Sequence, residues 1–293
     1  MGLTGCCPGR VRDRGGTGGR QNAAMRAAPP RLVACDLDGT ILRSDGTISP
    51  RTAAALDRIE AAGARYVFVT GRRPRYTEAV LGPFGYQGTV ICVNGALTYD
   101  MGGGGVTAQQ LIPARQLAEA AARLRQAIPG LGIAVEYADG QIRDGVYQRG
   151  AWVREEEVPH LPDDQLFARD ATRLLGRHPG LSADKLLELA DPAAGEIVTV
   201  FHSGGRGLVE AVAAGVSKGT AVAALAGRLG IEAHEVVAFG DMVNDLPMLA
   251  WAGTSYGMAN AHPAVLALAD HVIGGNDEDG VAAVIEQLFA DSL

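Results

Sequence analysis

The stretch that decides the fold is Leu32-Val33-Ala34-Cys35-Asp36-Leu37-Asp38-Gly39-Thr40, an apolar run that ends in two carboxylates. A β-strand places residues i and i+2 on one face, so Asp36 and Asp38 can leave the end of the strand side by side. Neighbouring carboxylates repel each other, and a divalent cation with oxygen ligands is the usual compensation. Gly39 lets the backbone turn and present N–H groups to an anion such as phosphate. An ordinary Asp-Gly turn is the alternative interpretation.

Three later segments also place polar side chains at the end of an apolar run or at the start of a helix. Thr70-Gly71-Arg72 follows the apolar run 67–69, and Gly240-Asp241-Met242-Val243-Asn244-Asp245 follows the run 236–239. Ser217-Lys218-Gly219 begins an alanine-rich helical segment and places an ammonium group at its start. Open α/β sheets bind ligands just beyond the carboxyl ends of their strands, which is where these side chains fall.

The flanking segments alternate between strand and helix patterns, which predicts an α/β fold with a doubly wound parallel sheet. Ser49-Pro50 supplies an N-cap and a first-turn proline for a helix that ends at Gly63. The predicted strands are 31–36, 65–69, 89–93 and 235–239, and the further predicted helices are 74–82, 218–229, 245–251 and 279–289.

The pattern of strands and helices changes between the segment that contains Thr70 and the segment that contains Lys218, which predicts an inserted α+β domain. Strands are expected at 106–111, at 196–202 and in a hairpin formed by 132–137 and 141–147 around Asp139-Gly140. Helices are expected at about 113–127 and 163–175, with a further segment around 183–189. The predicted domains are a core of residues 31–97 and 213–293 and an insertion of residues 98–212, with Gly102–Gly105 as a turn near the hinge.

Residues 1–30 are rich in glycine and arginine and lack an apolar stretch that could form the centre of a signal peptide. We interpret them as a disordered tail or as the product of a mis-assigned start, since Met25 lies shortly before the first strand.

Together, these segments resemble the four motifs of the haloacid dehalogenase-like phosphatases, in their order, and the flanking sequence resembles the Cof-type branch. Further matches are Asn94-Gly95-Ala96, the segment 257–261 and the segment 277–282. The resemblance covers residues 31–98 and 213–290 closely. It implies a Rossmann-like core, and the position and length of the insertion match the larger, type-two (IIB-like) cap of this branch.

The resemblance also implies roles for individual residues. Asp36 would be the nucleophile that forms an aspartyl phosphate, and Asp38 would be the general acid and base. Mg²⁺ would be held by Asp36, the main-chain carbonyl of Asp38, and Asp241. The residues expected to bind phosphate or support the site are Thr70, Gly71, Asn94, Lys218, Asn244 and Asp245, the last by orienting Lys218.

Other polar residues carry weaker expectations. Arg72 and Arg73 could lie near the site, but we interpret them as solvated surface arginines, and we interpret Asn276 and Asp279 as structural. Cys35 alternates away from Asp36 on its strand, so we expect no catalytic role for it. Three residues of the predicted hairpin could face a substrate: Glu136, Tyr137 and Arg143.

Composition restricts the partners. A net charge of −7 and a pI near 5.4 argue against nucleic acid or an anionic membrane as the main partner. The sequence has no run of 18 apolar residues, and its four cysteines show neither metal-ligand spacing nor a disulfide framework. We therefore expect a cytoplasmic monomer or homodimer.

The function expected from these features is hydrolysis of a small phosphorylated metabolite, such as a sugar phosphate or a nucleotide or cofactor phosphate, with Mg²⁺ as cofactor. A sugar phosphomutase of similar fold and a non-catalytic phospholigand-binding protein remain alternatives.

Overall fold

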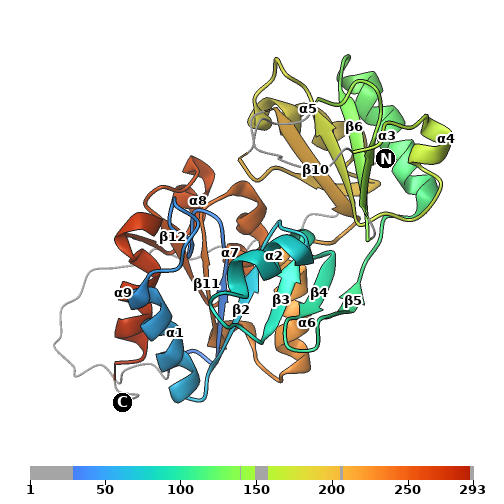
Figure 1. Cartoon of the computed structure of the whole chain (residues 1–293). Helices are drawn as coiled ribbons and strands as arrows, with labels where there is room; N and C mark the ends of the chain where they lie inside the picture. The colour runs from blue at the N-terminus through green and yellow to red at the C-terminus, as the bar shows by residue number, and fades with distance from the viewer. Residues whose placement is uncertain (1–28, 139, 149–157, 205–206, 291–293) are drawn as a thin grey trace, which may run out of the picture.

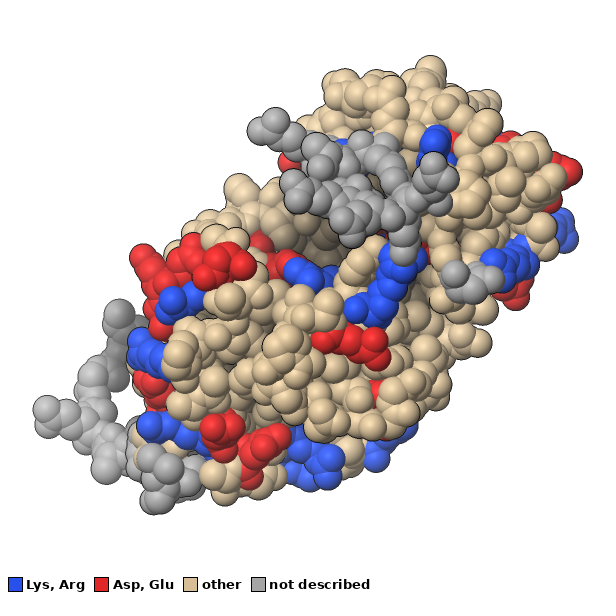
Figure 2. Space-filling model, in the orientation of Figure 1, with Lys and Arg blue, Asp and Glu red and all other residues tan. Residues whose placement is uncertain are grey.

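The computed structural model describes residues 29–138, 140–148, 158–204 and 207–290, and it arranges them around two β-sheets that lie apart in Figure 1. The predicted tail, apart from residues 29 and 30, lies outside the described residues. None of the helices within these ranges is long and apolar enough to cross a bilayer. Figure 2 shows acidic and basic side chains interspersed over one face of the molecule.

The larger sheet has the strand order β13-β12-β11-β1-β2-β3-β4-β5. Strands β13 to β3 in this order are parallel, and β4 and β5 add an antiparallel edge. The predicted doubly wound parallel sheet is confirmed, because the chain winds outward from β1 in both directions. The strands are β1 (Leu32–Cys35), β2 (Arg65–Val69), β3 (Thr89–Cys92), β4 (Leu97–Asp100), β5 (Gly105–Gln109), β11 (Val236–Gly240), β12 (Thr254–Met258) and β13 (His271–Ile273).

Helices cover this sheet, with α1 packed against α9 and α6 packed against α7. Ser49 caps α1 as predicted, because its hydroxyl accepts a hydrogen bond from the Thr52 N–H. Ser217 caps α6 in the same way through the Thr220 N–H. The helices of this unit are α1 (Pro50–Ala61), α2 (Pro74–Leu81), α6 (Lys218–Arg228), α7 (Leu246–Trp251), α8 (Pro263–Leu268) and α9 (Gly280–Leu288).

The second sheet is antiparallel, with the order β7-β6-β8-β10-β9. Helices α3 and α5 pack together on one of its faces and enclose a separate apolar core. Residues on the opposite face line a cavity shared with the first unit. The elements are α3 (Ala114–Ala127), β6 (Gly132–Tyr137), β7 (Gly140–Arg143), α4 (Asp163–Leu166), β8 (Arg173–Arg177), α5 (Ala183–Ala194), β9 (Val198–Phe201) and β10 (Leu208–Ala213).

Two expectations about the insertion are wrong. The strand predicted at 106–111 belongs to the larger sheet, because β5 forms a hairpin with β4 across the glycine-containing turn 101–104. The helix predicted at 163–175 ends at Leu166, and β8 takes a central place in the second sheet. Strand β10 was not predicted. Because β4 and β5 extend the larger sheet, we propose that the inserted cap begins after Gln109 rather than at residue 98.

Candidate active site

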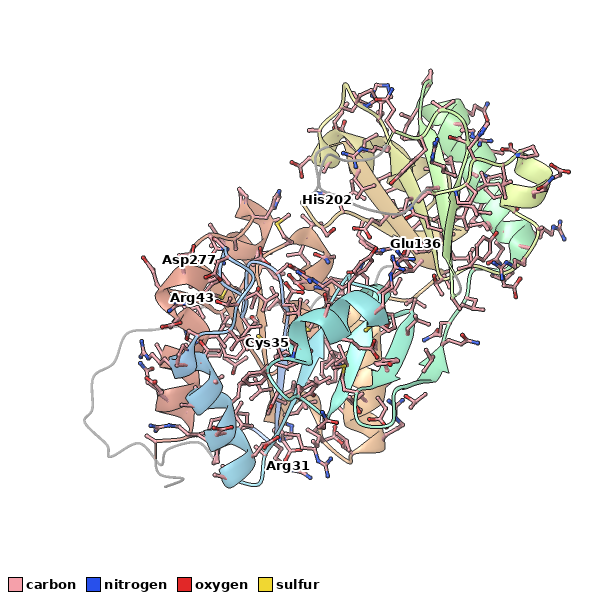
Figure 3. The ribbon with its side chains drawn as sticks, viewed as in Figure 1. Arg31, Cys35, Arg43, Glu136, His202 and Asp277 are labelled. Carbon is pink, nitrogen blue, oxygen red and sulfur yellow. The ribbon has the colours of Figure 1, made fainter. Side chains whose placement is uncertain are left out.

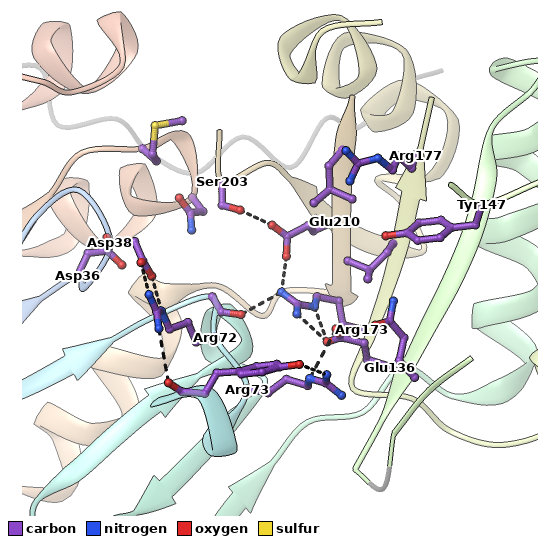
Figure 4. Close-up of a pocket in the computed structure, with 17 residues that line it drawn as sticks. Asp36, Asp38, Arg72, Arg73, Glu136, Tyr147, Arg173, Arg177, Ser203 and Glu210 are labelled. Carbon is purple, nitrogen blue, oxygen red and sulfur yellow. Dashed lines mark hydrogen bonds and ion pairs between the residues drawn. The ribbon is translucent and has the colours of Figure 1, made fainter. Parts of the chain in front are cut away.

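The predicted site residues meet at one edge of the larger sheet. Asp36 follows β1, Thr70 follows β2, Asn94 follows β3 and Asp241 follows β11. These strands are adjacent and parallel, so their carboxyl ends converge. Above them lies a cavity of about 520 Å³, whose lining comes from both units and includes Asp36, Asp38, Gly71 and Asn244 (Figure 4).

A buried ion-pair cluster holds Asp36 in place. The Lys218 ammonium donates to Asp36 Oδ1 at 2.5 Å and to Asp245 Oδ1 at 2.6 Å. Burial alone would lower the pKa of Lys218, but Asp245 and Asp36 raise it above its ordinary value, so the side chain stays charged. The predicted contact between Asp245 and Lys218 is therefore present. The buried Cys35 thiol donates to the Asp36 main-chain oxygen at 3.3 Å, and burial raises its pKa well above the ordinary value.

The second oxygen of Asp245 organises the loop that carries Asp241. Asp245 Oδ2 accepts the backbone N–H groups of Asp241 at 3.0 Å and Met242 at 2.9 Å. The Thr40 hydroxyl donates to Asp241 Oδ1 at 3.0 Å. Gly39 has φ +76°, and a Cβ atom there would lie 2.3 Å from Asp241 Oδ2, so only glycine fits this approach.

The charges of this cluster fit a divalent cation. Carboxylate oxygens of Asp36, Asp241 and Asp245 lie within 4.8 Å of one another, and Lys218 is the ammonium that contacts the cluster. Burial, and then the nearby Asp245, raise the pKa of Asp241 to about 7. Burial also raises the pKa of Asp36 well above its ordinary value, while Lys218 opposes this shift. A hard cation with oxygen ligands would relieve this excess negative charge.

Asp38 is held by an arginine. Arg72 Nε and Nη2 donate to its two carboxylate oxygens at 2.7 and 2.5 Å (Figure 4). The Asp38 side chain is 57% exposed, so it faces the cavity rather than the buried cluster. The interpretation of Arg72 and Arg73 as solvated surface residues is wrong, because both line the cavity.

A second group of predicted residues surrounds Gly71. The Thr70 hydroxyl accepts the Arg72 N–H at 3.1 Å, and Asn244 Nδ2 donates to Asn94 Oδ1 at 2.8 Å. Asn94 has φ 54°, a left-handed conformation that is strained for most residues but that asparagine tolerates. Asn94 Nδ2 and Asn244 Oδ1 are buried without a partner among the described residues. Rotation of both amides exchanges these atoms, so either side chain can offer an N–H group to a bound anion.

The cap forms the opposite wall of the cavity. Strand β8 supplies Arg173, Leu175 and Arg177, which share one face of the strand, and β6 and β10 supply Glu136 and Glu210. Figure 3 shows Glu136 on the cap where it faces the larger sheet. Of the hairpin residues considered, Tyr137 points into the cap interior and donates to the Leu166 carbonyl at 2.7 Å.

The remaining polar residues contact backbone or surface partners. Arg143 Nη1 donates to the carbonyls of Asp144 and Tyr147. Asn276 Nδ2 donates to the Leu42 carbonyl at 2.9 Å, and Asp279 forms an ion pair with Arg43 at 2.9 Å. These contacts agree with the structural role expected for Asn276 and Asp279.

Arg173 and Glu210 were not among the predicted site residues, because the pattern favoured a helix at the first and no strand was predicted at the second, whereas they lie on β8 and β10. An available signal was the spacing of Arg173, Leu175 and Arg177 at every second position, which is the period of a strand.

The comparison with protein families decides the affiliation of the chain. A family model described as haloacid dehalogenase-like hydrolase matches residues 33–285. The chain belongs to this family. Two relatives of this haloacid dehalogenase-like hydrolase are each 30% identical to it. HMP-PP phosphatase of Cronobacter sakazakii aligns over 86% of this chain and 93% of its own length. Pyridoxal phosphate phosphatase YbhA of Escherichia coli aligns over 87% of this chain and 97% of its own length.

Solved structures support the same fold. The structure of BT1666 from Bacteroides thetaiotaomicron, described among phosphatases of this superfamily, superposes on the hydrolase with a TM-score of 0.74 at 21% identity. It covers 94% of this chain and 100% of the BT1666 chain. The structure of TM0651 from Thermotoga maritima gives a TM-score of 0.69 at 25% identity, over 88% and 97% of the two chains. The fold of the hydrolase is therefore shared with these two structures over most of its length.

Proposed function

We propose that this hydrolase is a Mg²⁺-dependent phosphatase that releases phosphate from a small phosphorylated metabolite through an aspartyl phosphate on Asp36. The observation that carries the proposal is the contact of Asp36 with Lys218 at the floor of a cavity that Asp38 also lines. A carboxylate held beside a buried ammonium group is oriented for attack, and the cation offsets the charge of an approaching phosphate.

The first half-reaction transfers the phosphoryl group to Asp36. A carboxylate oxygen of Asp36 forms a bond to phosphorus while the bond between phosphorus and the leaving oxygen breaks. Asp38, protonated and released from Arg72, donates its proton to that leaving oxygen. Lys218, the Thr70 hydroxyl, the Gly71 backbone and the amides of Asn94 and Asn244 would contact the phosphate oxygens.

The second half-reaction restores the enzyme. Asp38, now ionised, accepts a proton from a water molecule whose oxygen attacks phosphorus, and the bond to Asp36 breaks.

The residues that would hold Mg²⁺ are Asp36, Asp241 and the main-chain carbonyl of Asp38. When bound, the cation neutralises negative charge at the phosphate and at Asp36. Asp245 is better suited to support than to ligation, because both of its oxygens accept hydrogen bonds from Lys218 and the loop backbone.

The cap favours a small substrate. A cavity of about 520 Å³ is within the usual range for small-molecule sites, and the cap wall would contact the leaving group and exclude water. The names of the two relatives describe phosphatases acting on HMP-PP and on pyridoxal phosphate, which supports a cofactor-type or similar metabolite phosphate as the substrate here.

The test is phosphate release from p-nitrophenyl phosphate and from a panel of phosphorylated metabolites, with Mg²⁺ and with a chelator in its place. We expect Mg²⁺-dependent turnover of both kinds of substrate. A requirement for a sugar bisphosphate activator would indicate a phosphomutase instead. Binding of phosphorylated ligands without any turnover would indicate a sensor and contradict the proposal.

A further inference from the structure

Arg173 connects the cap to the loop that follows β2. Its side chain lies on β8 in the cap, and Nη1 donates at 2.9 Å to the carbonyl oxygen of Gly71 in the larger unit. The residue is only 9% exposed. In Figure 4 its guanidinium lies between the two units, bonded on both sides.

Two cap carboxylates fix the orientation of this guanidinium. Strand β8 lies between β6 and β10, so Arg173 is flanked by Glu136 and Glu210. Arg173 Nε donates to Glu136 Oε2 at 2.8 Å, and Nη1 also contacts Glu210. The Ser203 hydroxyl donates to the second oxygen of Glu210 at 2.5 Å. Arg173, Glu136 and Glu210 are buried and Gly71 is half-buried, so the guanidinium is held firmly as it reaches Gly71.

Gly71 lies next to groups that we assign to phosphate binding. It directly follows Thr70, and a Cβ atom at Gly71 would lie 3.1 Å from Asn94 Nδ2. The Thr70 carbonyl in turn accepts the Asn94 N–H at 3.0 Å. We therefore expect a displacement of Gly71 to shift the Thr70 hydroxyl and the Asn94 amide, which we assign to phosphate binding.

We propose that Arg173 is a positioning residue: by bonding the Gly71 carbonyl, it lets the docked cap fix the phosphate-binding loop of the other unit. This inference rests on the proposed phosphatase function. Arg173 acts through Gly71 rather than on the phosphate, because its bonds are directed to Glu136, Glu210 and Gly71.

The test uses Arg173→Lys with Arg125→Lys as a matched control. Arg125 also bridges two cap carboxylates, those of Asp144 and Asp163, but it does not line the cavity. Lysine keeps the positive charge at either position, but its ammonium group lacks the fork that reaches several acceptors at once. Thermal unfolding of both variants reports on the fold.

The decisive readout is the affinity for inorganic phosphate with Mg²⁺ present, measured by calorimetry and as product inhibition of p-nitrophenyl phosphate hydrolysis. Inorganic phosphate has no leaving group, so its affinity reports on the phosphate-binding groups without any contribution from leaving-group contacts with the cap. We expect binding to weaken about 5- to 10-fold in Arg173→Lys, the effect of one lost hydrogen bond, and to stay unchanged in Arg125→Lys. A folded Arg173→Lys variant with wild-type phosphate affinity would overturn the inference.

A second variant keeps the inference testable if Arg173→Lys does not fold. Combining Arg173→Gln with Glu210→Gln removes one charge of each sign and leaves Glu136 beside Arg73, at 3.8 Å. The same loss of phosphate affinity is expected. If the wild type neither hydrolyses p-nitrophenyl phosphate nor binds phosphate, the proposed function is wrong. If the wild type does both and the double variant binds phosphate equally well, only the role of Arg173 is wrong.

Discussion

The substitution Lys218→Arg tests whether activity requires only the positive charge of Lys218 or also the shape of its ammonium group. Lys218 is 1% exposed, and its ammonium lies 2.5 Å from Asp36 and 2.6 Å from Asp245. Arginine keeps the charge, but its planar end is wider and longer and cannot occupy the same point between two carboxylates. We expect kcat to fall by about 100-fold or more, the usual effect of removing one preorganised donor. Overpacking of the buried site should cost about 1–3 kcal/mol of stability.

The assay is steady-state hydrolysis of p-nitrophenyl phosphate at saturating Mg²⁺, with denaturant unfolding to measure stability. Lys185→Arg is the matched control, because Lys185 is 46% exposed and pairs with Glu188 on the surface. We expect its activity to equal that of the wild type and its stability to change by no more than about 0.5 kcal/mol. Near-normal turnover in a folded Lys218→Arg variant would show that charge alone suffices and would refute the geometric argument.

Three further outcomes follow from the site and its surroundings. Asp36→Asn should abolish turnover, and substantial activity in this variant would exclude Asp36 as the nucleophile. Asp38→Asn should slow both half-reactions but bind Mg²⁺ nearly as well as the wild type in calorimetry. Chelation should abolish phosphate release and added Mg²⁺ should restore it, and undiminished activity in a metal-free sample would contradict the metal assignment. Burial lowers the pKa of His202 below its ordinary value of 6.5, so the His202 imidazole binds a proton more readily in the unfolded chain than in the folded one. The free energy of unfolding should therefore fall as the pH is lowered from about 7 to about 5, and less so in His202→Gln; an identical slope in the variant would show that His202 does not contribute.

The larger unit could be predicted because its signals are local. The run 32–35 is apolar throughout and is buried on both faces of the sheet, and it ends directly at Asp36. Lys218 is one of only two lysines among 26 basic residues, so its place at a helix start was informative. Parallel strands then bring together the residues at their carboxyl ends, although these are far apart in the sequence.

The cap and its contacts could not be predicted to the same degree. Whether β5 joins one sheet or the other depends on its pairing with β4, which the strand pattern of 106–111 does not specify. The contact of Arg72 with Asp38 and that of Arg173 with Gly71 depend on how elements distant in sequence pack. An exposed and a paired arginine have the same local sequence pattern, so only the structure distinguishes them.

The central claim, covalent catalysis by Asp36, is tested most directly by trapping the phosphorylated enzyme. The wild type and Asp38→Asn are mixed with substrate and Mg²⁺, quenched in acid during turnover and mapped by peptide mass spectrometry. We expect one phosphoryl group on the peptide that contains Asp36 in the wild type and none in Asp36→Asn. If Asp38→Asn slows hydrolysis of the intermediate more than its formation, the variant should hold more of it. A phosphoryl group on another residue, together with retained turnover in Asp36→Asn, would contradict covalent catalysis by Asp36.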